Sequence, residues 1–260
     1  MGNTHLVIGD SHAHPDQPND RYDWLGQLVM DVRPDVIIDI GDWADMPSLS
    51  SYDRGTKNFE GRRYKKDVKA ALDARKRFAA PMNEYNAQRA RNKKAQYTPR
   101  MVFIEGNHED RIRRAINLQP ELEGAIDIQD LGYKKYGWEY HPFKEMVTID
   151  GITYCHYFTS GIMGRPISSD HPAAALVLKK HISATAGHSH VLDYSVRTRG
   201  DGTKLHGLVA GCYFDYHMDW AGDSNAMYWR GICVCRNVEN GEYDLETINI
   251  RTIQREYGEV

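Results

Sequence analysis

Five short clusters of Asp, Asn and His residues stand out in this chain because their side chains can bind metal ions or move protons. The clusters are Asp10-Ser11-His12, Gly41-Asp42-Trp43-Ala44-Asp45, Gly106-Asn107-His108-Glu109, His156 alone, and Gly187-His188-Ser189-His190. They offer nitrogen and oxygen ligands without a thiolate, which suits manganese, iron or zinc better than copper or an iron–sulfur cluster. Each cluster alone is more typical of a turn than of a ligand, but the five together predict a metal site.

The spacing of the two histidines in Gly187-His188-Ser189-His190 predicts how their rings are oriented. His188 and His190 lie two residues apart, so an extended chain would present both rings on one face. Glycine beside the ligands allows the sharp turns that bring the backbone close to a metal.

Predicted strands precede the first three clusters. Residues 6–8, 36–40 and 101–104 are short apolar or β-branched runs, and each ends in a loop of glycine and polar residues. Helices are predicted at residues 22–32, which Pro34 ends, and at 109–118. Strands of this kind imply a mainly parallel sheet, in which sites form at the carboxyl ends of the strands.

The chain after Gly137 is dominated by predicted hairpins. Residues 146–149 and 152–156 flank Asp150-Gly151, residues 191–199 and 204–210 flank Asp201-Gly202, and residues 232–238 and 243–250 flank Asn240-Gly241. A helix is predicted at 172–181. Because no linker or internal repeat interrupts the pattern, we expect a single α/β domain over residues 1–260 with two β layers.

A basic helical segment is inserted before the third strand. Residues 62–96 have a helical composition with an apolar stripe and Lys or Arg on the other face, and Pro81 should kink or split the helix. Residues 54–100 hold 15 Lys/Arg and 4 Asp/Glu, whereas the rest of the chain holds 18 and 32. This contrast predicts that the insert, residues 54–100, attracts a polyanion such as DNA or RNA; a merely solvated helix face is the alternative.

Composition excludes several protein classes. No apolar run approaches the roughly 18 residues of a membrane helix, and the first residues lack the features of a secretion signal. The four cysteines lack C-x-x-C spacing and are interpreted as reduced, buried thiols. We therefore expect a cytoplasmic globular protein without a membrane partner.

The order of the five clusters resembles the calcineurin-like metallophosphoesterase superfamily, whose pattern runs D-x-H, GD-x-x-D, GNH-[DE], an isolated His and GH-x-H. All of these elements occur between Asp10 and His190. The resemblance implies a four-layer metallophosphoesterase fold, with two central β-sheets in a sandwich flanked by helices. It covers neither the basic insert nor the part after His190. Similar standalone proteins occur in phage genomes, so a bacterial or phage-infected host cell is the expected setting.

The resemblance also implies a set of metal ligands. The residues implied to hold one ion are Asp10, His12 and His190; those implied to hold the other are Asn107, His156 and His188; the carboxylate of Asp42 would bridge the two ions. The expected cofactors are two divalent transition-metal ions, manganese first, with iron, zinc and nickel as alternatives. His108 would face the leaving group as a proton donor, and either Glu109 or Asp45 would orient a ring N–H.

Two cations about 3.5–4 Å apart lower the pKa of a shared water, and the resulting bridging hydroxide can attack phosphorus in line. The expected activity is therefore hydrolysis of phosphoesters. A phosphodiesterase or nuclease acting on nucleic acid or nucleotides is the first choice. A phosphomonoesterase acting on a protein or small metabolite is the alternative, and an inactive scaffold is the third. The oligomeric state is left open.

Aromatic residues near the clusters leave two further expectations. Tyr157 follows His156 where many family members have glycine, so it would narrow the approach to the second metal. Trp43 is interpreted as a core residue rather than a ring that stacks on a base. Residues 215–219 are interpreted as a polar loop near the rim, and the aromatic stretch 213–229 as packing under a loop, a cover for the site or a self-association patch.

Overall fold

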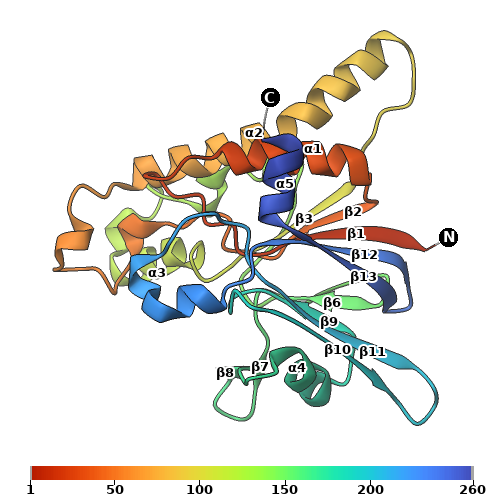
Figure 1. Cartoon of the computed structure of the whole chain (residues 1–260). Coiled ribbons are helices and arrows are strands. Elements are labelled where there is room, and N and C mark those ends of the chain that lie inside the picture. The colour runs from red at the N-terminus through yellow and green to blue at the C-terminus, as the bar shows by residue number, and fades with distance from the viewer. Residues whose placement is uncertain (1, 259–260) are drawn as a thin grey trace.

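Two β-sheets occupy the middle of the molecule (Figure 1). The computed structural model describes residues 2–258, apart from the side chains of Asp219 and Trp220, so these two members of the predicted clusters lie outside the described residues. The first sheet has the order β13-β12-β1-β2-β3-β4 and the second has the order β10-β11-β9-β6-β5. The strands of the first are β1 (Asn3–Ile8), β2 (Val36–Asp39), β3 (Arg100–Ile104), β4 (Glu139–His141), β12 (Gly231–Glu239) and β13 (Glu242–Asn249). The strands of the second are β5 (Val147–Ile149), β6 (Ile152–Tyr154), β9 (Ala184–Ala186), β10 (Leu192–Thr198) and β11 (Lys204–Ala210).

Parallel pairing brings the ends of the site-bearing strands together. β1, β2, β3 and β4 are parallel neighbours, with Ile8 opposite Asp39 and Asp39 opposite Phe103. In the second sheet β6, β9 and β11 are parallel neighbours. Since parallel strands end at the same edge, the loops after β1, β2 and β3 emerge together, and so do the loops after β6 and β9.

Helices cover both outer faces of the sheet pair (Figure 1). The helices are α1 (Asp20–Val32), α2 (Tyr64–Arg91), α3 (Asp110–Leu118), α4 (Pro172–Lys180) and α5 (Ile250–Tyr257). α1, α2 and α5 bury their apolar faces against the first sheet, and α4 packs Leu176 against the second. The four layers confirm the predicted α/β metallophosphoesterase architecture.

Short elements complete the chain. They are a small sheet of β7 (Thr159–Ser160) and β8 (Arg165–Pro166) and the 3-10 helices η1 (Pro47–Leu49), η2 (Lys57–Phe59), η3 (Pro120–Leu122), η4 (Ile128–Leu131), η5 (Lys134–Tyr136) and η6 (Asp219–Met227). Among the described residues, no helix combines the length and the apolar character needed to cross a membrane.

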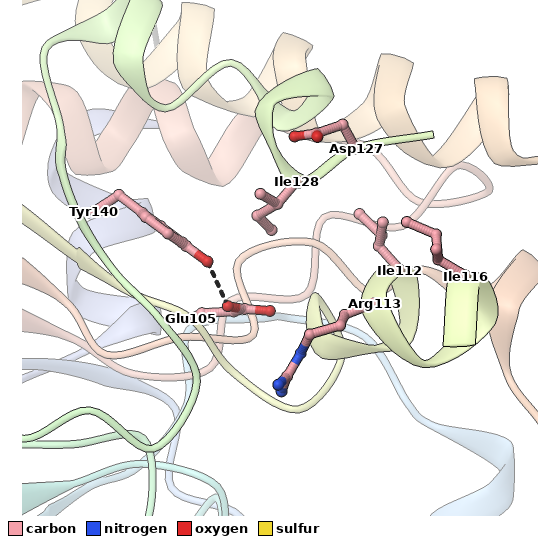
Figure 2. A pocket seen from close by; sticks show the side chains of 7 residues that line it. All are labelled: Glu105, Ile112, Arg113, Ile116, Asp127, Ile128 and Tyr140. Atoms are coloured by element: carbon pink, nitrogen blue, oxygen red, sulfur yellow. Dashed lines mark hydrogen bonds between the residues drawn. The ribbon is translucent and has the colours of Figure 1, made fainter. Parts of the chain in front are cut away.

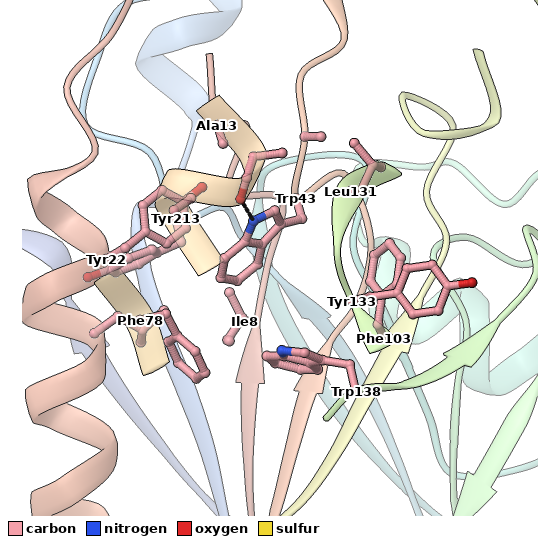
Figure 3. Packing of buried hydrophobic residues seen from close by; sticks show 14 of the residues in the cluster. Ile8, Ala13, Tyr22, Trp43, Phe78, Phe103, Leu131, Tyr133, Trp138 and Tyr213 are labelled. Atoms are coloured by element: carbon pink, nitrogen blue, oxygen red, sulfur yellow. Dashed lines mark hydrogen bonds between the residues drawn. The ribbon is translucent and has the colours of Figure 1, made fainter. Parts of the chain in front are cut away.

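Two apolar layers hold the sandwich together. Between the first sheet and its helices, Trp43, Phe78 and Trp138 pack edge to face or tilted at 5.6–6.1 Å between ring centroids (Figure 3). Trp43 is fully buried, which confirms its interpretation as a core residue. Between the two sheets, the buried Cys233 and Cys235 join the apolar side chains of both, and both thiols are free as predicted.

α2 remains one helix across Pro81, and it bends there rather than dividing. The helix runs from Tyr64 to Arg91 with the proline inside it, and its last turns point away from the sheet (Figure 1). Proline removes one backbone hydrogen bond and clashes with the preceding turn, which accounts for the bend. α2 ends at Arg91, so residues 92–96 of the predicted segment lie beyond it.

One basic residue of α2 contradicts the expectation that Lys and Arg lie on the solvent face. Arg75 is completely buried. Its guanidinium lies 4.5 Å from the ring centre of Trp43 and 4.7 Å from that of Phe103, and its Nη2 lies 3.5 Å from Asp39 Oδ2. Aromatic faces and a buried carboxylate together stabilise the cation inside the core.

Candidate metal centre

The five predicted clusters meet where the two sheets present the carboxyl ends of their strands. Asp10 and His12 follow β1, Asp42 follows β2, Asn107 and His108 follow β3, His156 follows β6, and His188 and His190 follow β9. Among the described residues, three groups bring their ligand atoms within 4.8 Å of one another: Asp10, His12 and His190; His12, Asp42 and His108; and Asp42, His156 and His188. Six of the seven predicted metal ligands and His108 belong to these groups, and the seventh, Asn107, places its Oδ1 2.9 Å from Nε2 of His156.

The first group contains ring nitrogens that face each other. Nε2 of His12 lies 3.2 Å from Nε2 of His190, which lies 3.1 Å from Oδ2 of Asp10. Nδ1 of His12 lies 2.9 Å from Oδ1 of Asp45 and donates to it, so Nε2 keeps its lone pair. Burial lowers the pKa of His12 to about 4, which keeps the ring neutral near pH 7. Two imidazoles and a carboxylate in this arrangement suit a divalent transition metal.

The group of Asp42, His156 and His188 also brings acceptor atoms together. Nδ1 of His156 donates to the carbonyl of Ile40 at 3.0 Å, so its Nε2 carries the lone pair. This nitrogen lies 2.9 Å from Oδ1 of Asn107 and 3.5 Å from Oδ2 of Asp42. Burial lowers the pKa of His188, the other ring of this group, to about 4. Lone pairs of the ring nitrogen, the amide oxygen and the carboxylate oxygen face one another with no hydrogen between them. A bound cation would fit among them, as it would in the group of Asp10, His12 and His190.

Asp42 belongs to two of the three groups, one with His12 and His108 and one with His156 and His188. Its Oδ1 accepts a hydrogen bond from the backbone N–H of His108 at 2.8 Å, and its Oδ2 points toward the ring nitrogens of His156 and His108. Burial alone would raise the pKa of Asp42, but the charges of His156 and His108 hold it below its ordinary value. The carboxylate thus stays ionised between the two sets of histidines.

The calcineurin-like phosphoesterase family matches residues 4–197, a span that contains every one of these residues. The chain belongs to the calcineurin-like phosphoesterase family. No curated protein matches the chain. Membership and the Asp/His groups together make the protein a metal-dependent hydrolase of phosphoesters.

Asp45 orients two rings of this phosphoesterase, which settles one of the alternatives left open by the spacing. Its Oδ1 lies 2.9 Å from Nδ1 of His12 and 3.1 Å from Nδ1 of His108, and its carbonyl lies 2.7 Å from the latter nitrogen. Burial would raise the pKa of Asp45, but the bonds to His108 and His12 hold it well below its ordinary value. Both rings therefore donate through Nδ1 and present Nε2 to the centre.

Glu109, the other residue predicted to orient a ring N–H, binds backbone N–H groups instead. Its carboxylate accepts from the backbone N–H groups of Asp42, Ala44 and Gly106 at 2.8–3.0 Å. Burial raises the pKa of Glu109 well above its ordinary value. The side chain ties the loop after β2 to the loop after β3. A Cβ on Gly106 would lie 2.1 Å from Oδ1 of Asp42, so the close approach of these loops requires glycine.

The expected extended conformation of the last cluster is wrong. His188 and His190 have φ angles of 69° and 60°, in the left-handed region that few non-glycine residues adopt. The turn sends His188 to the group of Asp42 and His156, and His190 to the group of Asp10 and His12. Separate groups for the two histidines agree with the ligand sets that the resemblance implies.

Aromatic rings surround both ends of the centre. The ring centre of Tyr157 lies 4.9 Å from that of His188. Its bulk therefore stands beside the proposed second metal site, where it was expected to narrow the approach. On the opposite side, Phe214 and Tyr228 pack edge-on against His190 at 5.3 and 4.6 Å. Tyr216, from the cluster interpreted as a rim loop, donates to the carbonyl of His12 at 2.7 Å. The stretch 213–229 therefore supports the histidines of the first group.

Two arginines of the site had no signal in the sequence pattern. Arg21 is fully buried at the start of α1 and donates to the carbonyls of Ser11 and His12. Arg111 lies on α3 and contacts the ring of His108. Neither belongs to the family pattern, and an arginine near the start of a helix is usually exposed.

A pocket of about 210 Å³ lies between α3, η4 and β4 (Figure 2), and none of the predicted ligands lines it. It is lined by Glu105, Ile112, Arg113, Ile116, Asp127, Ile128 and Tyr140. Glu105 accepts from Tyr140 Oη at 2.6 Å and from the N–H of Phe143 at 3.0 Å. The carboxylate thus fixes β4 next to the loop that carries Asn107 and His108.

Proposed function

We propose that this phosphoesterase is a two-metal phosphodiesterase that cleaves nucleic acid or nucleotides, with manganese as its ion. The observation that carries the two-metal proposal is the position of Asp42, whose carboxylate shares one group with His12 and another with His156 and His188. Two cations repel each other at short range, and a shared anion between them offsets that repulsion.

The residues on each side of Asp42 divide into two complete donor sets. Asp10, His12 and His190 would hold one ion, and Asn107, His156 and His188 the other. When bound, the two ions would lower the pKa of a shared water and neutralise charge on the phosphoryl oxygens. The chain itself supplies ring nitrogens fixed by Asp45 and Ile40, so little reorganisation is needed when the ions bind.

His108 is placed to give a proton to the departing oxygen. Asp45 holds its Nδ1, and its Nε2 lies at the edge of the centre, 3.8 Å from Oδ2 of Asp42. The ring keeps about a tenth of its surface exposed, so a substrate oxygen can approach it. In this structure Nε2 accepts a hydrogen bond from Nη2 of Arg111. To act as the acid, Nε2 would have to take up a proton and give up that contact, and the proton would then pass to the leaving alkoxide.

A basic surface beside the centre favours a polyanionic substrate. Asp67 and Arg62, at the start of α2, bond to Ser48 and to the carbonyl of Pro47 in the loop that follows Asp45. This end of α2 therefore adjoins the site. Among the described residues, the exposed bases of the insert that form no ion pair are Arg54, Lys57, Arg63, Lys65, Lys66, Lys69, Lys76, Arg91, Lys93 and Lys94, whereas the exposed Arg100 pairs with Glu139. Cations on such a surface neutralise phosphates and release counterions.

A substrate panel with Mn²⁺ tests the proposal. The substrates are bis-p-nitrophenyl phosphate, p-nitrophenyl phosphate, single- and double-stranded DNA, and cyclic dinucleotides. We expect faster turnover of the diester than of the monoester, together with cleavage of a nucleic acid or a nucleotide diester. The His108→Ala protein, purified identically, controls for contaminating phosphatases. Turnover of the monoester alone would instead support the phosphomonoesterase alternative.

A further inference from the structure

Arg111 extends from the second position of α3 to the edge of the metal centre. Its Nη1 donates to the carbonyls of Asp45 and Met46 at 2.8 and 3.2 Å, and its Nη2 donates to Nε2 of His108 at 3.2 Å. The residue is half-buried. Three contacts from one guanidinium fix its plane beside the ring that faces the leaving group.

The other hydrogens of this guanidinium have no protein acceptor. Among the described residues, neither Nε nor the second hydrogen of Nη2 has a hydrogen-bond partner, and no carboxylate pairs with Arg111. Its neighbours on α3 differ, because Arg113 and Arg114 both pair with Asp110. Arg111 is therefore the arginine of α3 whose charge is not paired with a carboxylate among the described residues and which keeps two donor hydrogens available.

We propose that Arg111 binds a phosphoryl oxygen of the substrate. An oxygen that contacts Nε2 of His108 lies within reach of Nη2 of Arg111, since these two nitrogens are 3.2 Å apart. A guanidinium is always charged and presents donors in a rigid fork that matches phosphate oxygens. Its anchor on two backbone carbonyls means that the charge is already in position before the substrate arrives.

The proposal rests on metal-dependent phosphoester hydrolysis and not on the choice between diester and monoester. Its test therefore uses inorganic phosphate, the product part common to all monoesters and an analogue of the phosphoryl group. The variants are Arg111→Gln, which removes the charge, and Arg111→Lys, which keeps it without the fork. Arg113→Gln removes a charge from the same helix at a position that does not contact the centre, and it serves as the matched control.

Two readouts are measured on Mn²⁺-loaded protein. The first is the inhibition constant of phosphate together with kcat and KM for both nitrophenyl esters and for an alkyl ester, whose leaving group has a higher pKa. The second is the rise in Tm that phosphate causes, which reports binding without turnover. For Arg111→Gln we expect phosphate inhibition to weaken about 10- to 100-fold, kcat/KM to fall about 100-fold for both esters, and the Tm response to disappear. Arg111→Lys should recover part of each loss, and Arg113→Gln should stay within about twofold of the wild type.

Two results would overturn the proposal. Unchanged phosphate inhibition and an unchanged Tm response in both Arg111 variants would show that the guanidinium does not touch the phosphoryl group. A fall in kcat that grows with the pKa of the leaving group, with phosphate binding intact, would make Arg111 a positioning residue for His108 instead. If Arg111→Gln lost its metal, Arg111→Lys would decide between these results. Failure of the diesterase proposal would appear separately, as a preference of the wild type for the monoester.

Discussion

Four residues of the centre adopt a backbone conformation that side chains usually avoid. His12, Asp42, His188 and His190 have φ angles between 44° and 69°, each at a cost of about 1–3 kcal/mol. Surrounding hydrogen bonds hold them: the carbonyl of Asp42 accepts from the N–H of His12, and Oδ1 of Asp10 accepts from the N–H of His188. Because glycine could adopt these angles but could not bind a metal, the fold has to carry this strain.

The role of His108 leads to a prediction at this scale. His108→Ala should keep the wild-type metal content, because the ring lies outside both proposed donor sets, while kcat falls about 10²–10⁴-fold, the usual contribution of a positioned proton donor. The loss should be smaller for nitrophenyl esters than for alkyl esters, whose leaving groups need protonation more. Steady-state kinetics and metal analysis measure both effects, with the exposed His171→Ala as control. An equal loss for good and poor leaving groups would contradict the proton-donor role.

At the scale of elements, strands with strong patterns were predictable and weakly patterned ones were not. The strands before Asp10, Asp42 and Asn107 and all three hairpins are confirmed. β9, which positions His188, is Ala-Thr-Ala in the middle of a sheet, and small residues carry little strand signal. α5 was also missed, since only eight residues form it and Asn249 alone marks its start.

The sequence also predicted only part of the site: which residues would meet, but not the contacts that orient them. Order and residue type placed the ligands at strand ends, and the resemblance divided them into two sets. The assignment of Asp45 to the rings and of Glu109 to the backbone depends on distances across loops far apart in sequence. The turn at His188 and His190 depends on tertiary strain, so local periodicity predicted the wrong conformation.

The docking of α2 gives a prediction for the element scale. Arg75 joins α2 to β2 through Asp39, and burial raises the pKa of that carboxyl to about 7 even beside the guanidinium. Arg75→Met should lower the free energy of unfolding by about 3–5 kcal/mol, because Asp39 would remain buried without its partner. Adding Asp39→Asn should recover part of that loss.

Urea unfolding at pH 7.5 measures these changes. Lys76→Met, an exposed neighbour on the same helix, should change stability by less than about 0.5 kcal/mol. A loss in the double variant as large as in Arg75→Met would show that the lost packing of the arginine, rather than the unpaired carboxylate, accounts for the effect.

The charge distribution belongs to the scale of the whole molecule. The insert was predicted as a helix with an apolar stripe and Lys or Arg on its other face, but several of these bases are buried or paired with carboxylates. Arg75 is buried, Arg77 pairs with Asp20, Asp23 and Asp73, and Arg62 pairs with Asp53. Most of the bases that remain available lie either before α2 and on its first turns or at and beyond its C-terminal end, so a nucleic-acid partner would meet two separate basic areas.

Reversal of the first basic area tests its role. The variant changes Arg63, Lys65, Lys66 and Lys69 to Glu, all of them exposed. Turnover of bis-p-nitrophenyl phosphate should stay within about twofold of the wild type, because the centre takes its ligands from strand ends. DNA binding should weaken strongly and its dependence on salt should flatten, since fewer counterions are released.

Binding titrations at several salt concentrations make this comparison. The matched control reverses four exposed bases outside the insert, Lys134, Lys179, Arg197 and Arg199, and should keep the wild-type salt slope. Equal weakening in the two variants would assign the effect to net charge. An unchanged slope in the α2 variant would make the helix face merely solvated.

The central claim is that this centre holds two ions bridged by Asp42, and anomalous scattering from a crystal grown with Mn²⁺ tests it most directly. We expect two manganese peaks, one contacted by Asp10, His12 and His190 and the other by Asn107, His156 and His188, with the carboxylate of Asp42 touching both. The Asp42→Asn protein should lose at least one of them. A single peak in the wild type, or two peaks that persist at full occupancy in Asp42→Asn, would contradict the bridged two-metal centre.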